Sequence, residues 1–162
     1  MLPDREKMTE EKCDSMKVIV SACLLGEKCK YNGGDNYNQA VVDFCKDKDV
    51  IPLCPETEAG MGVPRIPVEI REGRVIDRDG KDADARYRSG VAKVLEKIGS
   101  EKIDLAILKS RSPTCGVHEI YDGTFSGKLV RGRGILAEAL ARRGISLVDE
   151  EDDLFHDLQG KK

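Results

Sequence analysis

The sequence predicts a single α/β domain in which a parallel sheet is covered by helices on both faces. Short apolar runs rich in β-branched residues alternate with stretches whose apolar residues recur at helical spacing. This alternation is typical of parallel sheets, because the helices that connect successive strands lie across the faces of the sheet. A length of 162 residues with 40% hydrophobic content suits one domain with its own core.

The first half of the chain contains two expected strands and a helix. Residues 17–26, KVIVSACLLG, form a β-branched run followed by small residues and a glycine, which is typical of a buried strand entering a loop. Residues 38–46 place apolar side chains at helical spacing, and Asn36 or Asn38 can cap a short helix there. Residues 50–56, VIPLCPE, repeat the first pattern and predict a second strand.

The second half adds a hairpin, two helices and two strands. Residues 68–76, VEIREGRVI, alternate in polarity around a Glu-Gly pair and predict a small hairpin outside the main sheet. Residues 84–99 carry an apolar stripe and end at a glycine, as a helix does. Residues 104–109 predict a third buried strand, residues 133–143 a helix, and residues 145–149 the last strand.

Cysteines follow three of the expected strands. Cys23, Cys54 and Cys115 each lie just past the carboxyl end of a strand. Sheets of this kind bind ligands in the crevice beyond those ends, so we expect the three thiols to meet at one edge of the sheet. In a reducing compartment structural disulfides are rare, which favours metal binding or catalysis for such cysteines.

The residues alone leave two interpretations of these thiols open. Soft thiolates favour zinc, copper(I) or an iron-sulfur cluster, and a 4Fe-4S cluster with three cysteine ligands keeps one iron with an exchangeable position. Alternatively the cysteines only fill the interior, because free cysteine is among the most buried residue types. We assign such structural roles to Cys13 and Cys45, and Cys29 stays open between the two interpretations.

Two polar side chains lie next to these cysteines in the sequence. Glu56, two residues after Cys54, can act as a general acid or base, or it can be an exposed loop carboxylate. Ser112, three residues before Cys115, can bind a substrate or orient a water, or it can only stabilise the turn before Pro113.

Composition and net charge limit the classes of partner that the protein can bind. A formal net charge of −3 gives no basic footprint for duplex nucleic acid. The apolar runs are far shorter than the roughly 20 residues of a membrane span, and the polar start lacks the apolar core of a signal peptide. We therefore expect a cytoplasmic protein with a small-molecule ligand and no membrane partner. Residues 1–16 are expected as a disordered or mobile extension, 17–149 as the α/β domain and 150–162 as an acidic tail.

Three segments, SACLLGEKCKYNG, PLCPETEAGMGVPR and KSRSPTCG, together resemble a bacterial and archaeal family associated with thiouracil desulfidase activity, the TudS type. The resemblance implies a Rossmann-like fold and a 4Fe-4S cluster with three cysteine ligands, beside which lie an acidic residue and a serine. In this sequence the matching residues are Cys23, Cys54, Cys115, Glu56 and Ser112. The implied reaction removes sulfur from a thiolated pyrimidine, as a base or a nucleotide, to give the oxo base and sulfide.

Two other function classes remain on the residues alone. One is a non-catalytic module that holds a cluster or zinc as a sensor, and the other is a metal-free enzyme with Cys23 or Cys115 as nucleophile. A visible absorption band, with an iron and sulfide count after anaerobic purification, separates the three classes.

Overall fold

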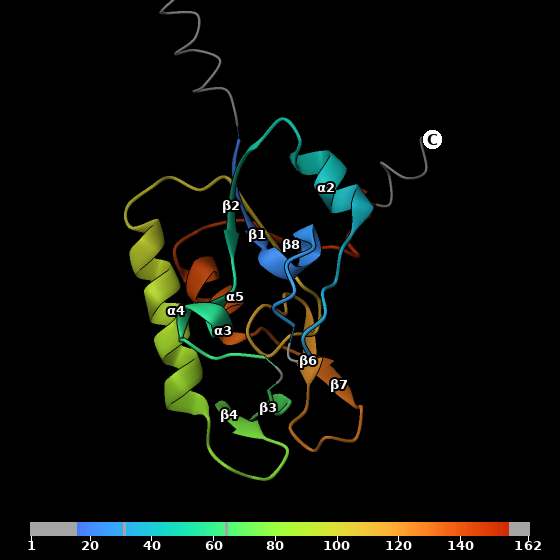
Figure 1. Ribbon diagram of the computed structural model, residues 1–162, viewed down its shortest axis with the longest axis vertical. Coiled ribbons are helices and arrows are strands. Elements are labelled where there is room, and N and C mark those ends of the chain that lie inside the picture. The colour runs from blue at the N-terminus through green and yellow to red at the C-terminus, as the bar shows by residue number, and fades with distance from the viewer. Residues whose placement is uncertain (1–15, 31, 64, 156–162) are drawn as a thin grey trace, which may run out of the picture.

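The computed structural model describes residues 16–30, 32–63 and 65–155. Its centre is a four-stranded parallel sheet in the order β2-β1-β5-β8 (Figure 1). The strands are β1 (Lys17–Ser21), β2 (Asp49–Leu53), β5 (Leu105–Leu108) and β8 (Leu147–Asp149). β1 pairs in parallel with both β2 and β5, and β8 completes the sheet along β5. The predicted α/β class with a parallel sheet is therefore confirmed.

Helices cover both faces of this sheet, as the sequence predicted. α2 (Gln39–Cys45) lies over one face, whereas α4 (Asp84–Ile98) and α5 (Ile135–Arg142) lie over the other (Figure 1). Successive side chains of a strand point to opposite faces, so Val18 and Val20 pack in the α2 core and Ile19 packs in the α4–α5 core.

Local signals determine where the helices begin and end. Of the two candidate caps for α2, Asn38 has this role, because its side chain accepts the Val41 N–H at 3.1 Å. α4 ends at Gly99, whose φ of 60° suits a residue without a Cβ. The expected helix ends agree with the structure to within two residues, whereas the second strand, expected over residues 50–56, ends at Leu53.

Two antiparallel hairpins lie beyond the carboxyl ends of the sheet strands (Figure 1). The first pairs β3 (Val68–Arg71) with β4 (Arg74–Asp77), as predicted, and Glu72 and Gly73 both have positive φ in its two-residue turn. The second pairs β6 (Glu119–Tyr121) with β7 (Leu129–Arg131). The sequence did not predict it, since three-residue strands are too short to show an alternating pattern.

The chain after β8 packs back onto the domain. Phe155 is fully buried in the α2 core, where its ring meets Phe44 edge to face at a centroid distance of 5.6 Å. The expected extension over residues 1–16 lies outside the described residues except for Met16, as does the expected tail from residue 156 onward.

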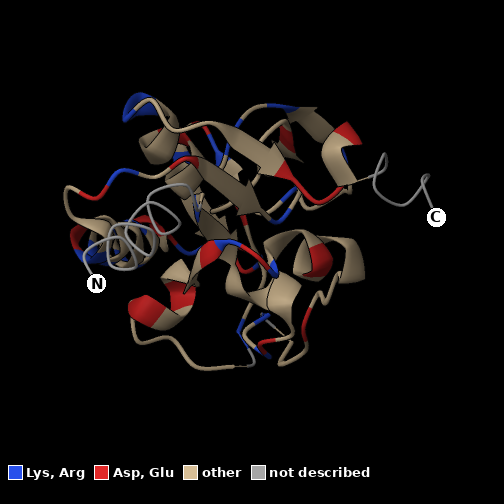
Figure 2. Cartoon of the chain, turned by 90° about the horizontal axis from the view of Figure 1, so that it is seen from above, with Lys and Arg blue, Asp and Glu red and all other residues tan. Residues whose placement is uncertain are grey.

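The surface chemistry of the described residues is mixed. Lys and Arg lie among Asp and Glu on the same elements, without a continuous basic stripe along any one element (Figure 2). Among the helices of the described ranges, none has the length and apolar character that a membrane crossing requires.

Candidate functional site

A cavity of about 540 Å³ opens at the carboxyl edge of the sheet. Its walls come from the ends of β1, β2 and β5 and from both hairpins. The residues of interest on these walls are Cys23, Cys29, Cys54, Cys115, Glu56 and Ser112. Ligand sites in open parallel sheets occupy this position, so the cavity is the candidate functional site.

Each of the three cysteines expected here is placed by the strand before it. Cys23 lies in η1 (Ala22–Leu25), the turn of 3-10 helix that directly follows β1. Cys54 is the N-cap of α3 (Pro55–Glu58), immediately after β2. Cys115 lies in the loop that follows β5. The structure thus brings the three thiols to one cavity, and their role as ligands stays a prediction.

Cys29 lines the same cavity, and we call Cys23, Cys29, Cys54 and Cys115 together the thiol cluster. The Cys29 thiol hydrogen-bonds with both Cys23 and Cys54, and those bonds raise its own pKa. The bond from Cys29, helped by the Asn36 amide and the Lys109 charge, lowers the pKa of Cys23 to about 7, although burial opposes the shift. The hydrogen bond with Cys29 also lowers the pKa of Cys54. The directions of these shifts favour ionisation of Cys23 and Cys54 over ionisation of Cys29.

Asn36 also contacts the thiol cluster. Its side-chain amide donates to Cys23 Sγ at 3.3 Å. The sequence had suggested Asn36 only as a helix cap, and nothing in its spacing signalled a contact with a residue 13 positions earlier.

Cys115 has a different environment, because it is buried. Burial raises the pKa of its thiol well above the ordinary value, and a hydrogen bond with Ser21 offsets part of that shift. Its loop is shaped by Ser112, whose Oγ accepts the N–H groups of Thr114 at 3.1 Å and of Cys115 at 3.0 Å. Ser112 therefore stabilises the turn, as one of its two predicted roles requires, and it also lines the cavity.

Glu56 lies in the first turn of α3 and not in a loop, which corrects the expected local structure. Its Oε1 is 3.5 Å from Cys54 Sγ, and its Oε2 accepts a hydrogen bond from the Thr114 hydroxyl. Thr114 is fully buried and adjoins Cys115 in the chain. The carboxylate thus links two of the cysteine-bearing segments, and its orientation is fixed from both sides.

The position of α3 depends on a glycine of α4. A Cβ built on Gly90 would lie 2.1 Å from the Pro55 carbonyl oxygen and 3.0 Å from Ala59 Cβ. Only a residue without a side chain allows the two helices to approach this closely. Gly90 therefore permits α3 to hold Cys54 and Glu56 against the cavity.

Positive side chains also line the cavity. Lys109 pairs with Glu150 at 3.2 Å, and Arg111 pairs with Glu151 at 2.7 Å. Arg65 donates to the Cys29 carbonyl at 2.7 Å, while its Nε is buried without a hydrogen-bond partner. Of these cations, Lys109 contributes by its charge to the lowered pKa of Cys23.

Of the two cysteines assigned to structural roles, Cys45 lies away from this site. Cys45 is buried in the α2 core on the opposite face from α4, which agrees with the expected role. Cys13 lies outside the described residues.

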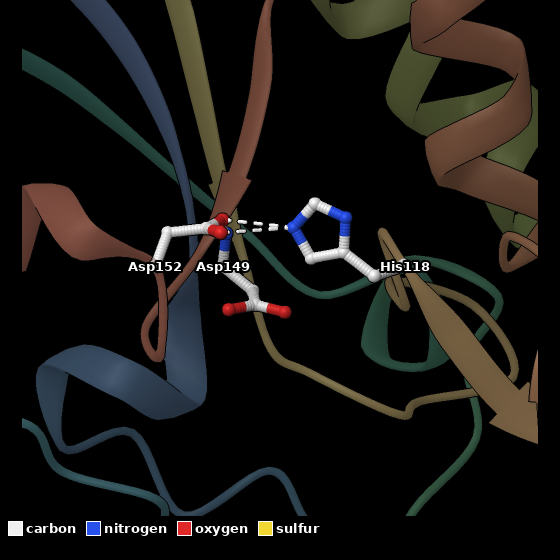
Figure 3. Close-up of side chains that lie close together, drawn as sticks. All are labelled: His118, Asp149 and Asp152. Atoms are coloured by element: carbon white, nitrogen blue, oxygen red, sulfur yellow. Dashed lines mark hydrogen bonds and ion pairs between the residues drawn. The ribbon is translucent and has the colours of Figure 1, made fainter.

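A second group of titratable side chains joins β8 to the start of β6 (Figure 3). His118 Nε2 lies 3.0 Å from both carboxylate oxygens of Asp152, and the same carboxylate accepts the Asp149 N–H at 2.7 Å. The hydrogen bond to Asp152 raises the pKa of His118 above its ordinary value, against a smaller effect of burial. These contacts connect the two strands outside the thiol cluster.

The donor set of the main cavity suits an iron-sulfur cluster. The cysteines that line it are all free thiols, and two of them have lowered pKa values. Thiolates are the usual protein ligands of such clusters. The cavity also extends beyond the thiols to the hairpins, which provides room for a second, organic ligand.

Comparisons with known proteins agree with one another. A family model described as 2-thiouracil desulfurase matches residues 18–152. The protein YbbK of Bacillus subtilis (strain 168), which carries the description uncharacterized, is 33% identical over 145 residues that cover 83% of this chain and 96% of YbbK. A solved structure described as the 4Fe-4S-dependent thiouracil desulfidase TudS has a TM-score of 0.78 and 32% identity, with 85% of this chain and 92% of that chain covered.

Proposed function

Because this chain belongs to the 2-thiouracil desulfurase family, we propose that it is a 4Fe-4S-dependent desulfidase acting on a thiolated pyrimidine. The substrate, a free base or a nucleotide, exchanges its sulfur for the oxygen of water and releases sulfide. The observation that carries the proposal is the meeting of free cysteines and a fixed carboxylate at one cavity. We assign the activity to the domain at residues 17–149, against which residues 150–155 pack. The cytoplasm suits this domain because thiols stay reduced there.

Cys23, Cys54 and Cys115 would hold the cluster, since each follows a different strand and all three face the cavity. When bound, the cluster supplies a Lewis-acidic iron to which the sulfur of the substrate can bind. Cys29, which interacts with the thiols of Cys23 and Cys54, would support the loop without being a ligand, so that the iron position would stay open to the substrate.

Glu56 is the proposed proton-transfer residue. The reaction consumes one water and returns its protons to the departing sulfide, so one carboxylate can accept a proton from water and later release it. The Thr114 hydroxyl holds one carboxylate oxygen, which fixes the direction of the other. Ser112, placed on the cavity wall by its bonds to two backbone N–H groups, contacts the substrate.

The buried environment of Cys115 argues against this residue as the nucleophile of a metal-free enzyme, and turnover without iron tests Cys23 in the same role. A nucleophilic thiol needs a lowered pKa and solvent access, whereas burial raises the pKa of Cys115. A thiol in such surroundings is a better metal ligand, because coordination removes its proton.

Turnover by anaerobically reconstituted protein tests the proposal. We expect 2-thiouracil to be consumed, with uracil and sulfide formed in equal amounts. Cys54→Ser should abolish this activity, and Cys45→Ser should keep it, because Cys45 lies in the α2 core. Turnover by protein free of iron, or none by fully loaded protein, contradicts the proposal.

A further inference from the structure

The loop between β6 and β7 carries a phenylalanine in a rare backbone conformation. Phe125 has a φ of 57°, in the left-handed region that bulky side chains seldom adopt. Its side chain is half-buried and lines the cavity that contains the cysteines. Strained residues of this kind persist only where surrounding contacts hold them, and they gather at functional sites.

The contacts that hold Phe125 come from β3. Glu69 Oε1 accepts the backbone N–H groups of Gly123 at 2.9 Å and of Phe125 at 3.0 Å. The Arg71 guanidinium donates twice to the Gly123 carbonyl, at 3.0 and 2.6 Å. Two charged side chains of one hairpin thus fix the loop of the other hairpin and direct Phe125 to the cavity.

Core packing does not account for the Phe125 ring. The chain has three phenylalanines, and two of them, Phe44 and Phe155, pack edge to face in the α2 core. Phe125 belongs to neither hydrophobic core cluster and has no aromatic partner among the residues that the structure describes. A ring on a cavity wall that lacks an aromatic partner is available to a ligand.

We propose that Phe125 is the stacking surface for the heteroaromatic ring of the substrate and that Glu69 is its positioning residue. The inference rests on the proposed function for the identity of the substrate. Stacking on an aromatic side chain recognises the flat face of a base, so it selects planar thiocarbonyl rings over puckered ones. The strain at Phe125 is maintained because the loop must present the ring at this place.

The comparison of 2-thiouracil with 5,6-dihydro-2-thiouracil tests this role. The two compounds share the thiocarbonyl and the ring N–H groups, but the saturated ring is puckered. We expect the reconstituted wild-type enzyme to prefer 2-thiouracil about tenfold in kcat/KM, the scale of one base–aromatic stack. Phe125→Leu keeps an apolar side chain but removes the flat aromatic ring, so it should lose that preference through KM, whereas Phe125→Tyr should retain it.

Two further variants distinguish a loss of the positioning of Phe125 from a general disturbance of its loop. Glu69→Ala should weaken the preference in the same direction, because the loop loses two of its bonds. Thr124→Ala is the matched control, since Thr124 is exposed in the same loop and does not line the cavity. An unchanged preference in Phe125→Leu overturns the inference, and so does an equal loss in Thr124→Ala.

A measurement of product binding tests the stacking role of Phe125 independently of the proposed desulfidase activity. Calorimetry with uracil and reconstituted protein requires no turnover. We expect the affinity for uracil to fall about tenfold in Phe125→Leu and to be restored in Phe125→Tyr, even if wild type fails to desulfurise 2-thiouracil. Equal affinities of wild type and Phe125→Leu, or no binding by wild type, refute the stacking role.

Discussion

Gly90→Ala tests whether the close approach of α3 and α4 forms the site. In an ordinary helix interior this change stabilises by about 1 kcal/mol, because alanine is the better helix former. Here the added Cβ would lie 2.1 Å from the Pro55 carbonyl oxygen, where real contacts essentially never fall below 3.0 Å. The two helices must therefore separate by about 1 Å.

The clash should outweigh the gain in helix propensity. Overpacking of a well-packed contact costs about 1–3 kcal/mol, and the upper end applies because a backbone carbonyl cannot change rotamer. The expected net loss is about 1–2 kcal/mol, or a fall in Tm of roughly 2–8 °C for a domain of this size. Since α3 carries Cys54 and Glu56, the variant should also take up less iron on reconstitution.

Thermal and urea unfolding of cluster-free protein, followed by circular dichroism, measures the stability change. Ser89→Ala is the matched control, because Ser89 is exposed on the same helix and its replacement gains propensity without a clash. If Gly90→Ala is as stable as Ser89→Ala and takes up iron to the wild-type level, the claim that the site requires close packing of α3 on α4 is contradicted.

Two other predictions address Glu56 and His118. Glu56→Gln should keep the cluster and bind 2-thiouracil while turning over about a hundredfold more slowly, the scale of a lost general acid-base group; turnover at the wild-type rate, measured by uracil formation, refutes that role. His118 should titrate above its ordinary pKa of 6.5 by NMR, and Asp152→Asn should lower that pKa. Because the folded pKa is raised, the pair stabilises the fold below pH 6.5 and loses this contribution as the pH rises through the folded pKa. An unchanged His118 titration in Asp152→Asn contradicts the pairing.

The sequence predicted the main sheet and its helices because their apolar patterns are local. The run at 17–21 is a continuous β-branched stretch, and the stripe at 84–98 contains enough residues to show a period of 3.6. The β6–β7 hairpin has strands of three residues and a polar loop, so its pairing depends on contacts with β3 that no local pattern contains.

The distinction between local patterns and contacts distant in sequence also applies to the site. Cysteines after three strands predicted a shared edge, since the topology of parallel sheets fixes where carboxyl ends lie. Thr114 and Glu56 meet across 58 residues of sequence, and Phe125 reaches the cavity through Glu69, 56 residues earlier. Such contacts arise only when the chain is folded, which is why spacing alone did not identify Asn36, Thr114 or Phe125.

Iron and acid-labile sulfide, counted per chain together with the visible absorption spectrum, test the central claim most directly. The protein should be reconstituted anaerobically as wild type and with serine at Cys23, Cys54, Cys115, Cys29 or Cys45 in turn. We predict about four iron and four sulfide ions per chain for wild type, Cys29→Ser and Cys45→Ser, and loss of the cluster in the other three variants. Equal loss in Cys29→Ser contradicts the open iron position, and zinc without sulfide in wild type contradicts the cluster itself.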